Sequence, residues 1–126
     1  MKRLMMIGFG AMAEEVLRHL PEELKLSWVV TTERSVERVK QAVAVDVQVM
    51  TSVAECDEDP DLVLECAGQA GIRSHGYAVL KRGWDLMVIS VGALADSKLA
   101  DELATASAAT GAHLHVLPGA IAGIDG

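Results

Sequence analysis

A chain of 126 residues has the length of one domain with a single hydrophobic core. Hydrophobic residues make up 51% of it and aromatic residues only 3%, so aliphatic side chains are expected to fill the core, as in a buried parallel sheet. A formal net charge of −7 argues against a nucleic-acid partner, because such binding needs a positive surface. No stretch reaches the roughly 18 apolar residues of a membrane span, and two cysteines are too few for a disulfide framework. These features exclude a membrane partner and predict a cytoplasmic protein.

Short apolar runs alternate with helical spacing along the whole chain. The runs predict strands at residues 4–7, 26–30, 45–49, 62–66, 86–90 and 114–117. Helices are expected from Gly10 to Pro21, after Ser35, over 71–82 with Gly83 as the C-terminal cap, and from Asp96 to Gly111. The polar residues 51–60 predict a surface loop with one turn of helix. Because parallel strands need crossover connections, this order predicts an α/β, doubly wound Rossmann fold over residues 1–126, with a mainly parallel six-stranded sheet and helices on both faces.

The stretch IGFGAMAEE joins the first strand to the first helix and contains Gly8, Gly10 and Ala13 in a G-x-G-x-x-A pattern. In dinucleotide-binding folds the first glycine permits a tight turn and the second lets the backbone approach a pyrophosphate. The amides around Gly10, Ala11 and Met12 open the helix without intrahelical partners and suit an anion. Ala13 falls on the apolar face of the helix. The pattern therefore predicts a dinucleotide site, with an ordinary glycine-rich turn as the alternative.

Two charged residues after the second strand bear on which dinucleotide binds. Glu33 lies near the spacing at which an acidic residue accepts hydrogen bonds from the adenosine ribose, which favours NAD. Arg34 stands beside hydroxyl side chains and could hold a 2′-phosphate, which favours NADP. The alternative for Arg34 is a solvated surface charge. NAD and NADP both remain open as the cofactor.

Small residues follow the last three predicted strands, where a cofactor lies across the carboxyl ends of a parallel sheet. They allow close approach by a dinucleotide, although each could simply make a tight turn. The predicted contacts are Cys66, Ala67, Gly68, Ser90, Gly92 and Ala93, with Gly119 and Ala120 after the last strand.

Other reactive side chains are weaker candidates. Cys66 precedes a helix and could be an activated nucleophile, but no basic partner is fixed nearby by spacing, and a small buried cysteine is the simpler interpretation. His75 is expected to be structural or half-exposed. His113 and His115 share one face of the last strand, but no third ligand accompanies them. The sequence therefore predicts no metal site.

The stretches ECAGQAGIRSHG, VISVGALAD and LPGAIAGIDG, together with the glycine motif, resemble the NAD(P)-dependent L-aspartate dehydrogenases. The resemblance covers essentially the whole chain. It implies oxidation of L-aspartate to iminoaspartate, which enters NAD biosynthesis or hydrolyses to oxaloacetate and ammonia, and a homo-oligomeric full-length enzyme. It also implies that Ala120 lies on the nicotinamide side.

The same resemblance implies a second, substrate-binding domain that carries the catalytic histidine. The sequence stops before such a domain, so we expect a fragment that has no catalytic residue of its own and is inactive alone. The alternatives are a related amino-acid dehydrogenase, such as homoserine dehydrogenase, and a dinucleotide-sensing module without chemistry.

Overall fold

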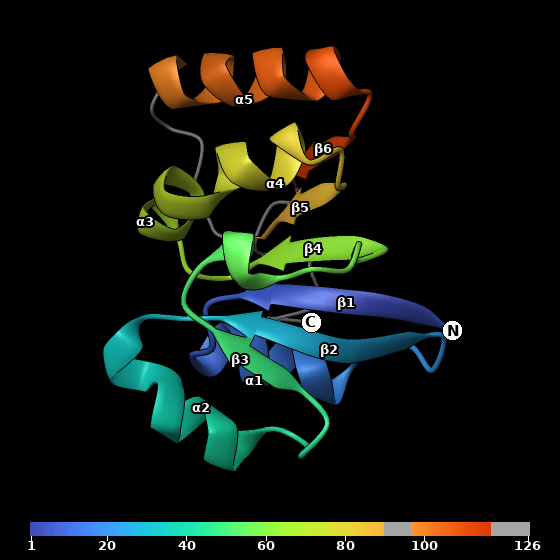
Figure 1. Cartoon of the computed structure of the whole chain (residues 1–126), viewed down its shortest axis with the longest axis vertical. Coiled ribbons are helices and arrows are strands. Elements are labelled where there is room, and N and C mark those ends of the chain that lie inside the picture. Colours follow the sequence, from blue (N-terminus) through green and yellow to red (C-terminus); the bar gives the residue numbers. More distant parts are fainter. Residues whose placement is uncertain (90–96, 117–126) are drawn as a thin grey trace.

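A computed structural model of the chain describes residues 1–89 and 97–116. In this part of the chain all strands join one sheet in the order β3-β2-β1-β4-β5-β6, and every neighbouring pair is parallel (Figure 1). The strands are β1 (Lys2–Ile7), β2 (Leu24–Val30), β3 (Gln48–Met50), β4 (Leu62–Glu65), β5 (Leu86–Val88) and β6 (Leu114–Val116). The order changes direction between β1 and β4, as in a doubly wound Rossmann sheet, and the predicted fold class is confirmed.

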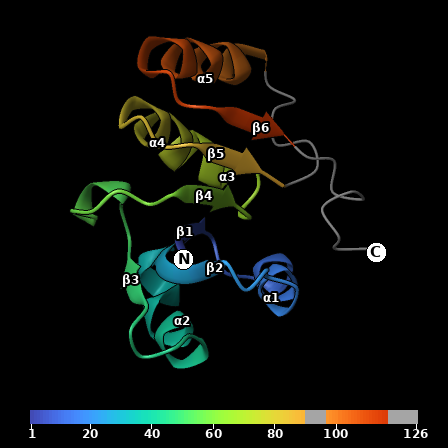
Figure 2. The same cartoon turned by 90° about the vertical axis from the view of Figure 1, so that its right-hand side faces the viewer.

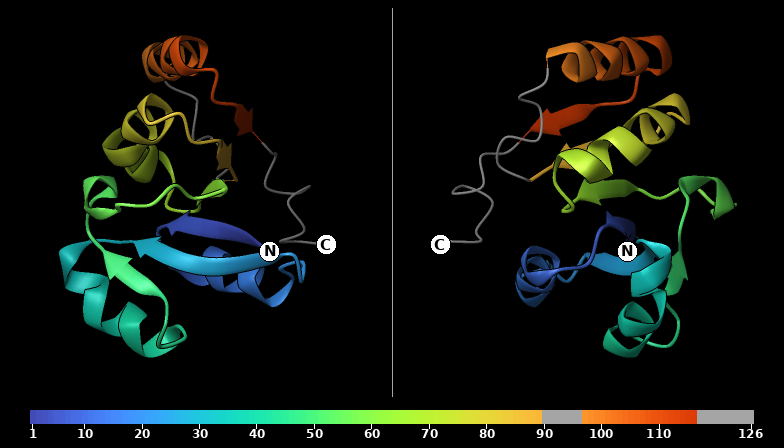
Figure 3. Two further views of the ribbon diagram at one scale, coloured as in Figure 1. Left: turned by 45° about the vertical axis from the view of Figure 1, so that its right-hand side comes forward. Right: turned by 90° about the vertical axis from the view of Figure 1, so that its left-hand side faces the viewer.

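Helices cover both faces of the sheet (Figure 2). One face packs against α1 (Ala11–Arg18) and α2 (Val36–Ala42), which follows the short 3₁₀ turn η1 (Glu33–Ser35). The other face packs against α5 (Ser97–Thr110) and the helix made of α3 (Gln69–Gly71), η3 (Ile72–Gly76) and α4 (Tyr77–Lys81). The views in Figure 3 show α1 and α4 on opposite sides of the strands. No helix in the described ranges is long and apolar enough to cross a membrane.

Alternation along β1 explains why the sheet needs helices on both sides. Leu4 and Met6 are buried in the core beneath α1, whereas Met5 and Ile7 are buried in the core beneath α4 and α5. Successive side chains of a strand point to opposite faces, so a strand of apolar residues must be covered twice. The first strand therefore lies at the centre of the molecule and carries its carboxyl end, Ile7, directly into the glycine motif.

The ends of several predicted elements shift by up to three residues in the structure, and two of the differences have a clear structural basis. The strand expected at 45–49 is wrong at its start, because β3 begins at Gln48 and Val45 is fully exposed. Pairing with β2 decides where this strand begins, since Trp28 lies opposite Gln48. The apolar pattern AVAVDV, which precedes Gln48, does not indicate this boundary. The helix expected over 71–82 is present, but η3 is a π-helical segment within it. The 51–60 loop contains the expected helical turn, η2 (Val53–Glu55), with a capping box between Ser52 and Glu55.

Candidate functional site

The glycine turn after β1 has the geometry that its first glycine predicts. Gly8 has φ +85°, a backbone conformation that side chains rarely adopt, and its N–H donates to the Val30 carbonyl over 2.8 Å. A Cβ at this position would lie 2.6 Å from Ala67 Cβ and 3.0 Å from Ala67 Cα. Both the backbone angle and the neighbouring chain therefore exclude a side chain at Gly8.

The second glycine faces open space. Gly10 is the N-cap of α1 in an extended conformation, and a Cβ built there meets nothing within 4 Å. The first helical hydrogen bond runs from the Glu14 N–H to the Gly10 carbonyl over 3.0 Å. Within the described residues the amides of Ala11 and Met12 have no acceptor, so they open the helix toward solvent at the positive end of its dipole. This arrangement suits an anion that approaches the backbone closely.

Ala13 has the packing role that the motif predicts. It is 0% exposed and belongs to the core between α1 and the sheet. A small residue here lets the helix lie close to the strands, which keeps the N-terminus of α1 next to the end of β1.

A contact that the sequence did not reveal fixes the middle of the glycine turn. The Arg38 guanidinium of α2 donates from Nη2 to the Phe9 carbonyl over 3.0 Å. Phe9 lies between the two glycines, and its side chain is buried in the core beneath α1. Arg38 thus ties α2 to the loop that precedes the open amides. In the sequence it is one of several charged residues on a short helix, and nothing distinguishes it.

A cavity of about 210 Å³ adjoins the glycine turn at the carboxyl ends of β1 and β2. Gly8 lies on one side of it, and Ala67 and Ala70 lie on the side formed by the chain after β4. Its polar lining comes from uncharged groups, namely Thr31, Thr32, Ser74 and His75. The carboxyl edge of a doubly wound sheet at its change of direction is where such folds bind ligands. The turn, the open helix end and the cavity together form one candidate dinucleotide site.

The comparisons with known proteins agree with this geometry. Residues 8–117 match the family model described as "Homoserine dehydrogenase, NAD binding domain". The chain belongs to this family of NAD-binding domains. The L-aspartate dehydrogenases of Acinetobacter baylyi and Acinetobacter baumannii are 56% and 52% identical to it over 126 residues. Each match covers the whole chain and 48% of the relative, so the chain spans about half the length of the curated relatives it matches.

A solved structure supports the fold. The aspartate dehydrogenase of Thermotoga maritima superposes with a TM-score of 0.64 at 16% sequence identity, covering 92% of this chain and 45% of that one. At this level of identity the likeness concerns the fold, which is the doubly wound sheet described above.

The predicted ribose-binding residues lie next to the cavity of this NAD-binding domain. Glu33 and Arg34 are exposed in η1, and neither lines the cavity. The two threonines that precede them line the cavity, and the Thr32 hydroxyl donates to the Ser35 hydroxyl over 3.1 Å. The sequence singled out the charged residues, whereas the structure adds Thr31 and Thr32 as the nearer polar groups. The choice between NAD and NADP is still open.

The three small residues after β4 have different surroundings. Ala67 lines the cavity, and its N–H donates to Glu65 Oε2 over 2.6 Å, so a fully buried carboxylate holds this loop. Gly68 has φ +84° and continues the turn into α3. Cys66 packs against the core beneath α1 and does not line the cavity.

The chemistry of Cys66 argues against a nucleophile. Burial, and to a smaller extent the neighbouring carboxylate of Glu65, raise the pKa of the Cys66 thiol to about 12. A thiol needs a lowered pKa to react as a thiolate near neutral pH. The interpretation of Cys66 as a small buried cysteine is therefore the one that the structure supports.

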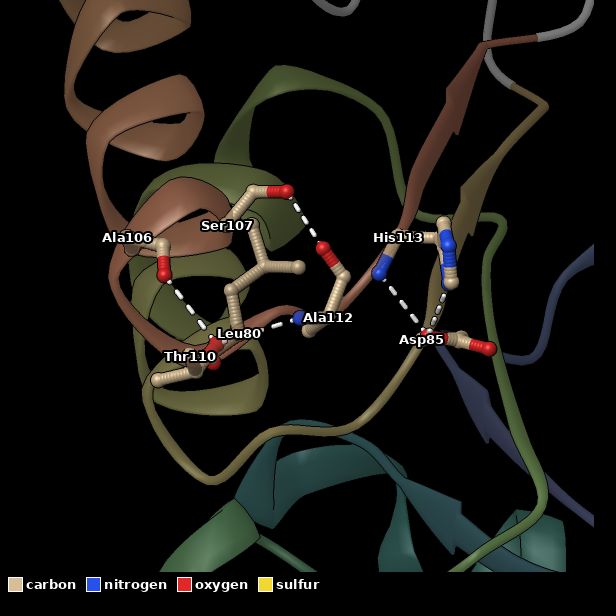
Figure 4. A network of polar contacts seen from close by, with 7 residues as sticks. All are labelled: Leu80, Asp85, Ala106, Ser107, Thr110, Ala112 and His113. Carbon is tan, nitrogen blue, oxygen red and sulfur yellow. Dashed lines mark hydrogen bonds and ion pairs between the residues drawn. The ribbon is translucent and has the colours of Figure 1, made fainter.

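The paired histidines lie toward the opposite edge of the sheet from the cavity. His113 precedes β6, where its backbone N–H donates to Asp85 Oδ1 over 2.8 Å and its Nδ1 lies 3.2 Å from the same oxygen (Figure 4). Its ring stacks on His115 with 6.0 Å between centroids. The described residues contain no group of three His, Cys, Asp or Glu side chains that could hold a metal. The contact between His113 and Asp85 thus joins the amino ends of β5 and β6.

Five of the predicted cofactor contacts lie outside the described residues. These are Ser90, Gly92, Ala93, Gly119 and Ala120. Their roles remain predictions from the sequence and from the resemblance.

Proposed function

We propose that this chain is the cofactor-binding part of an NAD(P)-dependent L-aspartate dehydrogenase. The observation that carries the proposal is the open N-terminus of α1, where Gly10 leaves room for a ligand and the Ala11 and Met12 amides lack acceptors in the described residues. A pyrophosphate brings the negative charge that such a helix end favours, by about 0.3–1 kcal/mol at an exposed site.

The remaining parts of the site then have defined tasks. Gly8 turns the chain so that β1 leads directly to the proposed phosphate-binding amides, and Arg38 fixes the Phe9 carbonyl between the two glycines. The adenosine half extends toward the cavity at the end of β2, since the chain there provides hydroxyl groups for a ribose. A bound nicotinamide would supply the hydride acceptor for oxidation of the substrate at its α-carbon.

The substrate follows from the relatives. The two Acinetobacter proteins carry the name L-aspartate dehydrogenase, and they match this chain over its whole length. We infer that the parent protein oxidises L-aspartate to iminoaspartate, with the groups that bind aspartate in the half of the relatives that this chain does not span. Homoserine is the alternative substrate, because the matching family model is described by homoserine dehydrogenase.

The same inference extends to the setting of the enzyme. A cytoplasmic location, assembly of the full-length protein into a homo-oligomer and delivery of iminoaspartate to NAD biosynthesis form part of the proposal. They rest on the resemblance to the aspartate dehydrogenases and on the acidic composition, which carries a net charge of −7. Analytical ultracentrifugation of a full-length protein would test the oligomer.

Cofactor binding is tested directly with the 126-residue chain. Titration with NADH and with NADPH should change the cofactor fluorescence, and Gly10→Val should abolish the change because the new side chain fills the open space. Ala54→Val, on the exposed turn η2, is the control and should bind like the wild type. Equal titrations for Gly10→Val and the wild type would refute the phosphate site.

Activity is tested with a protein that also contains the half of the relatives that this chain does not span. A chimera of this chain with the second half of the Acinetobacter baylyi relative should reduce NAD or NADP with L-aspartate. Activity with homoserine and none with aspartate would move the assignment to the alternative dehydrogenase. Tight dinucleotide binding without activity on either amino acid would favour the sensing module.

A further inference from the structure

The helix after β4 contains an unusual turn at the cavity. Its segment η3, Ile72–Gly76, is π-helical, and π turns are rare and frequent at functional sites. One side of the segment packs on the core, since Ile72 is fully buried and a Cβ on Gly76 would lie 3.2 Å from Leu103 Cδ2. The intervening residues Ser74 and His75 line the cavity beside the glycine turn.

The cavity has room for part of a ligand and is polar without being charged. Its volume of about 210 Å³ is several times the ~30 Å³ that one water occupies. Thr31 and Thr32 provide hydroxyl groups from the end of β2, and Ser74 and His75 provide a hydroxyl and an imidazole from η3. A neutral imidazole offers one N–H donor and one nitrogen acceptor. This set of groups matches the hydroxyls and base edge of an adenosine.

We propose that Ser74 and His75 bind the adenosine half of the dinucleotide, and that His75 does so as the neutral imidazole, so that acidification weakens this half of the interaction. The proposal rests on the proposed function, because it assumes that a dinucleotide occupies the site. It adds a recognition element from η3 and a pH dependence that the glycine motif does not supply.

The surroundings of His75 favour the neutral form. Burial lowers the pKa of His75, and no charged neighbour contributes to that shift. The charged groups on the elements around it are Glu65 on β4, Arg73 on η3, and Glu33 and Arg34 on η1, and none of them lines the cavity. On α5, Lys98 and Glu102 line a different cavity together with Arg73.

The sign of the pH effect follows from this burial. Since the pKa of His75 is below its usual value of 6.5, the imidazole is neutral at pH 7 and gains a proton only as the pH falls. Protonation replaces the nitrogen acceptor with a second donor and places a charge in a partly desolvated site. A ligand that hydrogen-bonds the neutral ring therefore loses affinity in acid.

The test uses two halves of the cofactor with the 126-residue chain. ADP-ribose contains the adenosine half and the pyrophosphate, whereas reduced nicotinamide mononucleotide lacks the adenosine. Calorimetric titrations at about pH 8 and about pH 5, the second well below an ordinary histidine pKa because that of His75 is lowered, should show ADP-ribose binding several-fold more weakly in acid. His75→Ala should weaken ADP-ribose binding by about tenfold at the higher pH, as expected for one hydrogen bond.

Two variants isolate the imidazole. His75→Gln keeps a donor and an acceptor but does not titrate. The affinity of this variant for ADP-ribose should therefore not show the decrease in acid that the wild type shows. His19→Gln removes an exposed histidine at the far end of α1 and should behave like the wild type. In the wild-type chain, the NMR signals of the His75 ring should shift with ADP-ribose and stay unchanged with reduced nicotinamide mononucleotide, which tests the contact without any substitution.

The outcomes separate the two proposals. If ADP-ribose and NADH fail to bind the wild-type chain at either pH, the proposed function fails. If ADP-ribose binds but His75→Gln has the wild-type pH dependence, or the His75 ring signals do not respond to it, the adenosine contact is refuted and the phosphate site stands. Tighter binding of ADP-ribose in acid would also refute the contact, because it would require the charged imidazole.

Discussion

The two glycines of the motif should lose very different amounts of stability on the same substitution. Gly8→Ala places a Cβ at φ +85°, 2.6 Å from Ala67 Cβ and 3.0 Å from Ala67 Cα. Gly10→Ala places a Cβ in open space at φ −111°, where no strain arises. The first change should therefore destabilise the fold strongly, and the second should lower stability much less while it obstructs the ligand.

The cost of Gly8→Ala has two parts. A left-handed backbone costs a residue with a Cβ roughly 1–2 kcal/mol, and forcing an extra carbon into a packed site costs about 1–3 kcal/mol. The free energy of unfolding should thus fall by about 2–5 kcal/mol, a large share of the 5–15 kcal/mol typical of a domain. Gly10→Ala should cost only about 0.5–1 kcal/mol, because alanine is a poorer N-cap than glycine but meets no clash at this position.

Urea denaturation followed by circular dichroism measures both values. The double variant Gly8→Ala with Ala67→Gly removes the closest contact but keeps the backbone strain, so it should recover part of the loss, with a coupling energy of about 0.5–3 kcal/mol. A Gly8→Ala protein with the wild-type midpoint would refute the reasoning about this turn. A Gly10→Ala protein destabilised as strongly as Gly8→Ala would show that the second glycine is structural.

Three further predictions concern other residues of the site and its supporting loops. Arg38→Ala removes the donor to the Phe9 carbonyl and should weaken NADH binding by about tenfold, as for one hydrogen bond; an unchanged fluorescence titration would contradict its positioning role. Cys66, whose thiol pKa is about 12, should resist iodoacetamide at about pH 8 in the native chain and react once urea unfolds it. Mass spectrometry measures the labelling, and rapid labelling of Cys66 in the native chain would disprove its assignment as a buried, unreactive thiol. Glu55 accepts hydrogen bonds from the Thr51 and Ser52 N–H groups, which lowers the pKa of its carboxyl below the usual 4.5. The contribution of this carboxylate to stability should therefore be complete above pH 4.5 and lost as the pH falls through the lowered pKa. Urea midpoints of the wild type and Glu55→Gln should accordingly converge in acid, and a constant difference would exclude this linkage.

Local signals in the sequence determined the architecture of this protein and the location of its candidate phosphate site. Apolar runs separated by helical spacing are enough to predict a parallel sheet, because each strand must be buried on both faces and joined by a crossover. The glycine motif is equally local: a bend, an open helix end and a small packing residue all lie within the six residues from Gly8 to Ala13. The structure confirms the bend, the open end and the packing residue.

Tertiary structure alone decided which side chains from distant segments share the site. Arg38 meets the Phe9 carbonyl across 29 positions of sequence, and His75 reaches the cavity from a π turn that helical periodicity cannot distinguish from an ordinary turn. The start of β3 likewise depended on its partner strand, since aliphatic residues occur on both sides of the true boundary. Such pairings depend on how separate elements pack, and a pattern confined to neighbouring residues carries no record of that packing.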